Sequence, residues 1–84
     1  MHYTLTLPSG QVHGSSSLDN TLDFLRRLLD RDGLPTEGRY LVHERWTADG
    51  RFGTTGPMQR LVLGVDNDGP FSLDGSGIPV PTTI

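Results

Sequence analysis

The sequence predicts a small α+β domain in which one helix packs on an antiparallel sheet. Two observations carry this prediction: an amphipathic run over residues 21–32, and several short segments in which apolar and polar residues alternate. The chain has 84 residues, which is enough for a single hydrophobic core. It also contains 11 Gly and 6 Pro, so we expect turns to make up much of the domain.

The composition argues against several classes of protein. The chain has no cysteine, which excludes disulfides, thiolate catalysis and cysteine-ligated zinc, and favours a reducing cytoplasm. A net charge of −3 disfavours nucleic acid as a partner. No apolar run approaches the roughly 20 residues that span a bilayer, and no signal peptide pattern is present, so we expect no membrane partner and no export. The lack of lysine indicates GC-rich codons, and hence a high-GC bacterium or its phage.

The first element predicted is a β-hairpin at the N-terminus. Tyr3, Leu5 and Leu7 alternate with polar residues, as expected for a half-buried strand. A turn at residues 8–10 then reverses the chain, and the returning strand sets Val12 beside Leu7. We therefore expect Val12 and Leu7 both to face the core.

A helix over residues 21–32 follows. Its apolar arc consists of Leu22, Phe24, Leu25, Leu28 and Leu29. Asn20 is the expected N-cap with Ser17 as a competing cap, and Gly33 is the expected C-terminal residue with positive φ. Asp23 and Arg27 have the spacing of an ion pair on the helix surface. We expect the centre of the apolar arc, at Phe24, Leu25 and Leu28, to contact the sheet.

Further strands are predicted after the helix. Residues 39–46 are rich in strand formers, and Asp49-Gly50 is a turn signal that predicts a second hairpin. Residues 59–65 form a strand that we expect to be central, and residues 71–73 form a short edge strand. The residues of the central strand expected on one face are Leu61, Leu63 and Val65.

This order of elements resembles that of ubiquitin-like β-grasp domains over residues 1–65. Residues 32–37 followed by 40–42 are similar to the helix exit and third strand of ubiquitin, and residues 60–63 are similar to its last strand. The resemblance implies a ββαββ domain over residues 1–69. Residues 70–84 would then be an extension, either a hairpin or an extended segment, packed on the sheet.

The resemblance also implies a function and a site. If Leu41, Leu61 and Leu63 point inward, Val42 and Val62 are exposed, and with Arg60 they match the positions of the main partner-binding patch of ubiquitin. We therefore expect a non-enzymatic protein-binding module, an adaptor or an inhibitor of a larger bacterial or phage protein. It would be a monomer or a weak homodimer, and would need no cofactor or metal.

Two alternatives stay open. A ubiquitin-like modifier or sulfur carrier ends in Gly-Gly, whereas Asn67 and Asp68 stand at the aligned positions, so this function would require proteolysis after Gly69, Gly75 or Gly77. The second alternative is a small enzyme or metal-binding protein that uses histidines. His2 and His13 could meet across the first hairpin, although the spacing is not that of a strong metal motif. The serines at residues 15–17, with His13 and Asp19 nearby, are interpreted as cap and linker residues rather than a catalytic triad.

Overall fold

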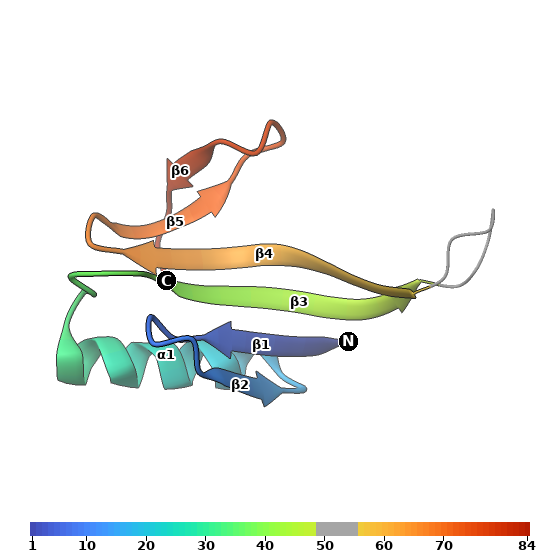
Figure 1. Cartoon of the computed structure of the whole chain (residues 1–84), viewed down its shortest axis with the longest axis horizontal. Helices are drawn as coiled ribbons and strands as arrows, with labels where there is room; N and C mark the ends of the chain where they lie inside the picture. The colour runs from blue at the N-terminus through green and yellow to red at the C-terminus, as the bar shows by residue number, and fades with distance from the viewer. Residues whose placement is uncertain (49–55) are drawn as a thin grey trace.

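The computed structural model describes residues 1–48 and 56–84 and shows an α+β fold (Figure 1). In those residues the chain forms one helix and six strands. Their bounds are β1 His2–Thr6, β2 Val12–Ser15, α1 Leu18–Asp32, β3 Tyr40–Ala48, β4 Gly56–Asp66, β5 Gly69–Leu73 and β6 Pro79–Pro81. The predicted class, with a single helix, is confirmed. The predicted turn at Asp49-Gly50 lies outside the described residues.

The six strands form one sheet in the order β2-β1-β3-β4-β5-β6, and every neighbouring pair is antiparallel. β1 lies between β2 and β3, although α1 separates it from β3 in the sequence (Figure 1). β3 and β4 are the two middle strands, which confirms the prediction that residues 59–65 belong to a central strand.

The first hairpin forms as predicted, but its register differs from the expected one. The turn closes with a hydrogen bond of 2.8 Å from the Leu7 N–H to the Gln11 carbonyl, and Gly10 adopts a φ of 95°. Val12 pairs with Thr6 rather than with Leu7. Because side chains alternate between the two faces of a strand, this register turns Val12 away from the helix and leaves it 56% exposed. The prediction that Val12 faces the core is therefore wrong, whereas Leu7 does pack against the core.

The helix begins three residues earlier than expected. Ser17, not Asn20, is the N-cap, because its hydroxyl accepts a hydrogen bond from the Asn20 N–H at 3.3 Å. The earlier start lets Leu18 pack against the core. At the other end Gly33 has a φ of 74° and donates its N–H to the Leu29 carbonyl at 2.7 Å, as predicted.

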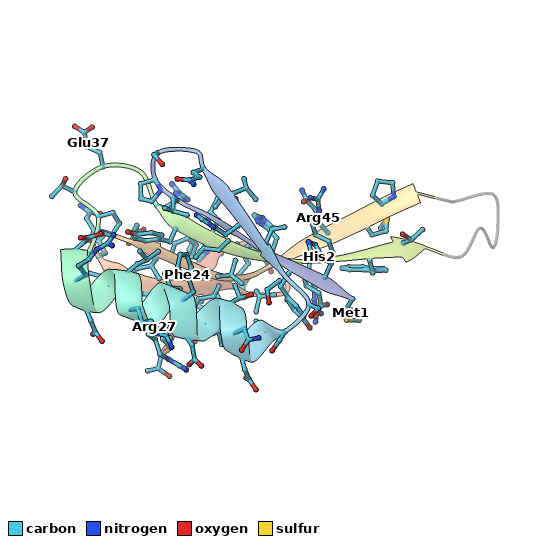
Figure 2. The ribbon with its side chains drawn as sticks, turned by 90° about the horizontal axis from the view of Figure 1, so that it is seen from below. Met1, His2, Phe24, Arg27, Glu37 and Arg45 are labelled. Carbon is cyan, nitrogen blue, oxygen red and sulfur yellow. The ribbon has the colours of Figure 1, made fainter. Side chains whose placement is uncertain are left out.

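The helix packs on the sheet through the predicted face. Leu25 and Leu28 are buried, and Phe24 is partly buried against the same core. Figure 2 shows Phe24 on the side of the helix that faces the sheet and Arg27 on the side that faces away. On that outer surface Asp23 pairs with Arg26 at 2.9 Å, in place of the expected pair with Arg27. None of the described helices is both long and apolar enough to cross a membrane.

A β-bulge in β4 decides which residues enter the core. Val42 pairs with Leu63, but the next residue of β3, His43, pairs with Leu61, so Val62 is an extra residue. Leu61 therefore shares a face with His43, opposite to the face of Val42 and Leu63. The prediction that Leu61 lies on one face with Leu63 and Val65 is wrong for this reason. The buried apolar cluster consists of Leu5, Leu25, Leu28, Tyr40, Val42, Leu63 and Val65.

The C-terminal residues form a second hairpin that extends the sheet. β5 pairs with β4 over Gly64–Asp66, and β6 pairs with β5. Phe71 of β5 is buried. The turn between the two strands is held by Asp74, whose side chain accepts hydrogen bonds from the N–H groups of Ser76 and Ile78.

Candidate functional site

The three residues expected to bind a partner do not form an exposed patch. Val42 is 0% exposed, because it lies between Leu5 on β1 and Leu63 on β4 beneath the helix. Its expected exposure is wrong. Val62, the bulge residue, is partly buried against the core. Arg60 alone is exposed at the surface.

Arg60 belongs to a polar cluster that crosses three strands. Tyr3 of β1, Glu44 of β3 and Arg60 of β4 are successive partners in the register, so their side chains share the face that carries the helix. The Arg60 Nε donates to Glu44 Oε1 at 3.0 Å, and the Tyr3 hydroxyl donates to Glu44 Oε2 at 3.1 Å. The Glu44 side chain is 10% exposed and that of Arg60 is 68% exposed.

In this geometry the Glu44 side chain links three strands of the sheet. Each oxygen of the Glu44 side chain accepts a hydrogen bond from a neighbouring strand, one from Arg60 on β4 and the other from Tyr3 on β1. The hydrogen bond to Glu44 also raises the pKa of the Tyr3 hydroxyl above its ordinary value, with a smaller contribution from burial. Tyr3 is therefore held as a neutral hydrogen-bond donor to Glu44.

Beyond this cluster, β3 and β4 continue as a two-stranded arm. The last pair between β1 and β3 is His2 with Arg45, while β3 and β4 stay paired as far as Ala48 and Gly56. Figures 1 and 2 show the two strands extending past β1 and past the helix. A two-stranded ribbon has little stability of its own in water, so an arm of this kind gains from contact with another surface.

Trp46 and Met58 face each other on this arm. They form the next pair on the same side as Glu44 and Arg60, because each lies two residues further along its strand. Trp46 is half-buried, and Met58 is 48% exposed. We call the surface made by Tyr3, Trp46, Met58 and Arg60 the arm surface.

The arm surface was not predicted from the sequence, although one signal for it is present. Val42, Glu44 and Trp46 are spaced two apart, so they must share a face of β3. Since Val42 is in the core, the same face carries Trp46 outward past the end of the core. The misplacement of Val42 on the outer face hid this relationship.

The histidines expected to meet across the first hairpin lie on opposite faces. His13 pairs with Leu5 on the helix face, and its ring lies 5.0 Å from that of Phe24, measured between centroids. His2 lies on the other face, where its ring lies beside Gly14. No group of three or more His, Asp or Glu side chains suited to a metal ion occurs within residues 1–48 and 56–84.

The serines near His13 have structural roles. The Ser15 hydroxyl accepts a hydrogen bond from the Ser17 N–H at 3.1 Å, and the Ser17 hydroxyl caps the helix. A cleft of about 240 Å³ lies between β2 and the start of α1, and it is lined in part by His13, Ser15 and Phe24. The sequence left open whether Asn20 or Ser17 caps the helix, and the structure shows that Ser17 does.

Comparisons with protein-family models, with curated proteins and with solved structures give no match to this chain. A function for this chain can therefore be inferred only from its own residues.

Proposed function

We propose that this protein is a non-enzymatic module that binds another protein through the arm surface. The observation that carries the proposal is the position of Trp46 and Met58 on a two-stranded arm that extends beyond the helix. Aromatic residues, Met and Arg are the types enriched at the centres of protein interfaces. In the cell the module would act as an adaptor or as an inhibitor of a larger bacterial or phage protein.

The arm surface favours a particular chemistry in the partner. Trp46 and Met58 offer an apolar area, and Arg60 lies at its border with most of its side chain exposed. Because Glu44 holds the Arg60 Nε, the outer part of the guanidinium group is oriented before binding. A partner with an apolar pocket beside a carboxylate would match this arrangement. The net charge of −3 disfavours nucleic acid as the partner. The location that we propose for the module is the cytoplasm.

The proposal does not depend on a ubiquitin-type function. The order ββαββ is present over His2–Asp66, which is what supports the β-grasp likeness. Every described pair of neighbouring strands is antiparallel, however, and β1 lies beside β3. Maturation into a modifier by cleavage after Gly69 would also remove Phe71 from its buried position against β4, so this alternative has less support.

A photo-crosslinking experiment in the native host tests the proposed function. A photoreactive amino acid replaces Met58 in one variant and Val12 in a matched variant, because Val12 is exposed to a similar degree but lies on the β2 edge. We expect position 58 to yield one discrete cross-linked product with a protein other than this chain itself, and position 12 not to yield it. Trp46→Ala in the position 58 variant should reduce the yield at least tenfold.

Two outcomes would overturn the proposal. One is the same set of products from positions 58 and 12, which would indicate random collisions. The other is a product from position 58 that is unaffected by Trp46→Ala while the variant remains folded. Once a partner is identified, the fluorescence of Trp46 reports binding directly, since it is the single tryptophan of the chain.

A further inference from the structure

β4 has a long edge that no described strand occupies. It runs over Gly56–Asp66, but β5 pairs with it only over Gly64–Asp66. Figure 1 shows β5 turning away from β4 beyond that point. Within residues 1–48 and 56–84, the side of β4 opposite β3 is therefore without a strand partner from residue 56 to residue 63.

The register shows which backbone groups face this edge. In an antiparallel pair, residues alternate between those that direct N–H and C=O toward the partner strand and those that direct them away. Pro57 pairs with Thr47 and has no N–H to donate, so it suits a position whose backbone groups point away from β3. By alternation Gln59 and Leu61 also direct their N–H and C=O groups away from β3, into the open edge.

The other sheet edges are better guarded against pairing. β6 begins and ends with Pro79 and Pro81, which cannot donate hydrogen bonds. β2 has four residues and offers only a short edge. On the open edge of β4 the one charged side chain between residues 57 and 61 is Arg60, and Glu44 already pairs with it. Pro57 also faces this edge, but Gln59 and Leu61 retain both backbone groups there, so this is the longest edge of the described sheet that can add a strand.

We propose that a second copy of this chain occupies the open edge, forming an antiparallel dimer about a two-fold axis at Gln59. In this register Gln59 pairs with the second copy's Gln59, and Arg60 lies across from the second copy's Met58. The register shifted by one residue would place Arg60 directly opposite the second copy's Arg60, and like charges directly opposite are destabilising. The Gln59 register avoids that repulsion, pairs both backbone groups of Gln59 and gives the Leu61 N–H an acceptor in the second copy's Pro57 carbonyl.

The dimer has a consequence for the arm surface. Met58 and Arg60 both belong to the arm surface and lie on one face of β4. Pairing about Gln59 brings the arm surfaces of the two copies side by side on the same face of a joined sheet. The dimer itself does not depend on the proposed function, since it needs no other protein.

Disulfide trapping tests the register. The chain has no cysteine, so Gln59→Cys introduces a single thiol on each copy. Directly opposite residues that exchange backbone hydrogen bonds have Cα atoms about 5.5 Å apart, which is within the range a disulfide can bridge. Gln11→Cys is the matched control, because Gln11 is an exposed glutamine in the first hairpin turn. We expect Gln59→Cys to form covalent dimers under mild oxidation at least tenfold faster than Gln11→Cys.

A charge exchange tests the two-fold axis independently. Sedimentation equilibrium should show the unmodified chain dimerising with a Kd below about 1 mM. Gln59→Lys and Gln59→Glu each place like charges across the axis, so each should raise the Kd at least tenfold, while Gln11→Lys should not. An equimolar mixture of Gln59→Lys and Gln59→Glu should restore the dimer, because the two charges then attract.

The proposal would be overturned by any of three results. An unmodified chain that stays monomeric throughout would show that the edge is not occupied by a second copy. A dimer that persists in both charge variants would place the interface elsewhere. Equal rates of disulfide formation at positions 59 and 11 would reject the register, and this measurement holds even where a charge variant fails to fold. None of these results bears on cross-linking at position 58 to a different protein.

Discussion

The ring of Phe71 lies directly over Gly64 across the pair of strands β4 and β5. A Cβ atom at position 64 would overlap three atoms of that ring. The guanidinium carbon of Arg39 lies 5.8 Å from the centroid of the same ring. Phe71 is thereby 7% exposed although it comes from the C-terminal hairpin, so this contact ties the hairpin to the rest of the sheet.

Gly64→Ala should destabilise the domain because the new methyl group has no space. Overpacking of this kind costs about 1–3 kcal/mol. Chemical denaturation followed by circular dichroism measures the loss. Gly75→Ala is the matched control, because a Cβ atom at position 75 meets nothing within 4 Å. Equal stability of the two variants would show that Phe71 does not pack on Gly64 in solution.

Deletion of residues 70–84 should expose the part of β4 that β5 covers. Hydrogen exchange of the Gly64 amide should accelerate, because Gly64 pairs with Phe71, which the deletion removes. The amides of Gln59 and Leu61 should change little, since β5 does not pair with them. Unchanged exchange at Gly64 in the shortened chain would contradict the described pairing.

Gly33→Val should weaken the end of the helix. Gly33 has a φ of 74° and a ψ of −166°, a backbone region that is almost exclusive to glycine. Forcing another residue into it costs about 1–3 kcal/mol, and valine adds a branched Cβ. The unfolding free energy should therefore fall by that amount. A variant as stable as the original chain would mean that Gly33 does not adopt positive φ.

Leu28→Ala should unfold the domain or lower its melting temperature sharply. Leu28 is buried between the helix and the sheet, and removing such a side chain costs about 2–5 kcal/mol. The unfolding free energy of a native protein is only about 5–15 kcal/mol, so this loss is a large fraction of it. Arg27→Ala, on the exposed side of the same turn, provides the control and should melt within about 4 °C of the original.

Stability should fall below neutral pH because of His43. Burial lowers the pKa of His43 below its ordinary value, and the nearby Arg45 lowers it further. The unfolded chain therefore binds a proton at His43 more readily than the folded chain does. As the pH falls below about 6.5, this difference favours unfolding. His43→Gln should flatten the dependence of the unfolding free energy on pH between about pH 7.5 and 5, a window on either side of the ordinary histidine pKa. An NMR titration that places the His43 pKa at or above 6.5 would contradict this explanation.

The helix was predictable because its signals are local. The apolar arc and Gly33 depend only on neighbouring residues, and both appear as expected. The start of the helix was less certain because Ser17 and Asn20 are both good cap residues. Tertiary contacts decided between them, since the earlier start buries Thr21 and lets Leu18 reach the core.

The faces of the central strands were not predictable from alternation alone. β3 and β4 carry apolar residues at adjacent positions, such as Leu41 with Val42 and Leu61 with Val62, so either face could have been the buried one. The bulge at Val62 then changes the alternation within β4 itself. Because the expected site was derived from these faces, its error at Val42 follows from the same cause.

The arm surface could have been predicted only after the register was known. Trp46 and Met58 are opposite each other because β3 and β4 pair over their whole described length. No local motif indicates that the pairing of β1 with β3 ends at His2 while β3 continues to Ala48. The boundary between the covered sheet and the arm is set by strand lengths, which sequence patterns define least well.

The position of β1 beside β3 also divides the chain into two units that could form at different times. β3 to β6 are joined in sequence order by hairpins, so their pairing closes only short loops and should be fast. The pairing of β1 with β3 must instead close the long connection through β2 and α1, with the loss of chain entropy that this entails. Docking of the β1, β2 and α1 unit onto β3 is thus the step that should set the folding rate, and substitutions along the β1 to β3 seam should slow folding more than substitutions in the C-terminal hairpin.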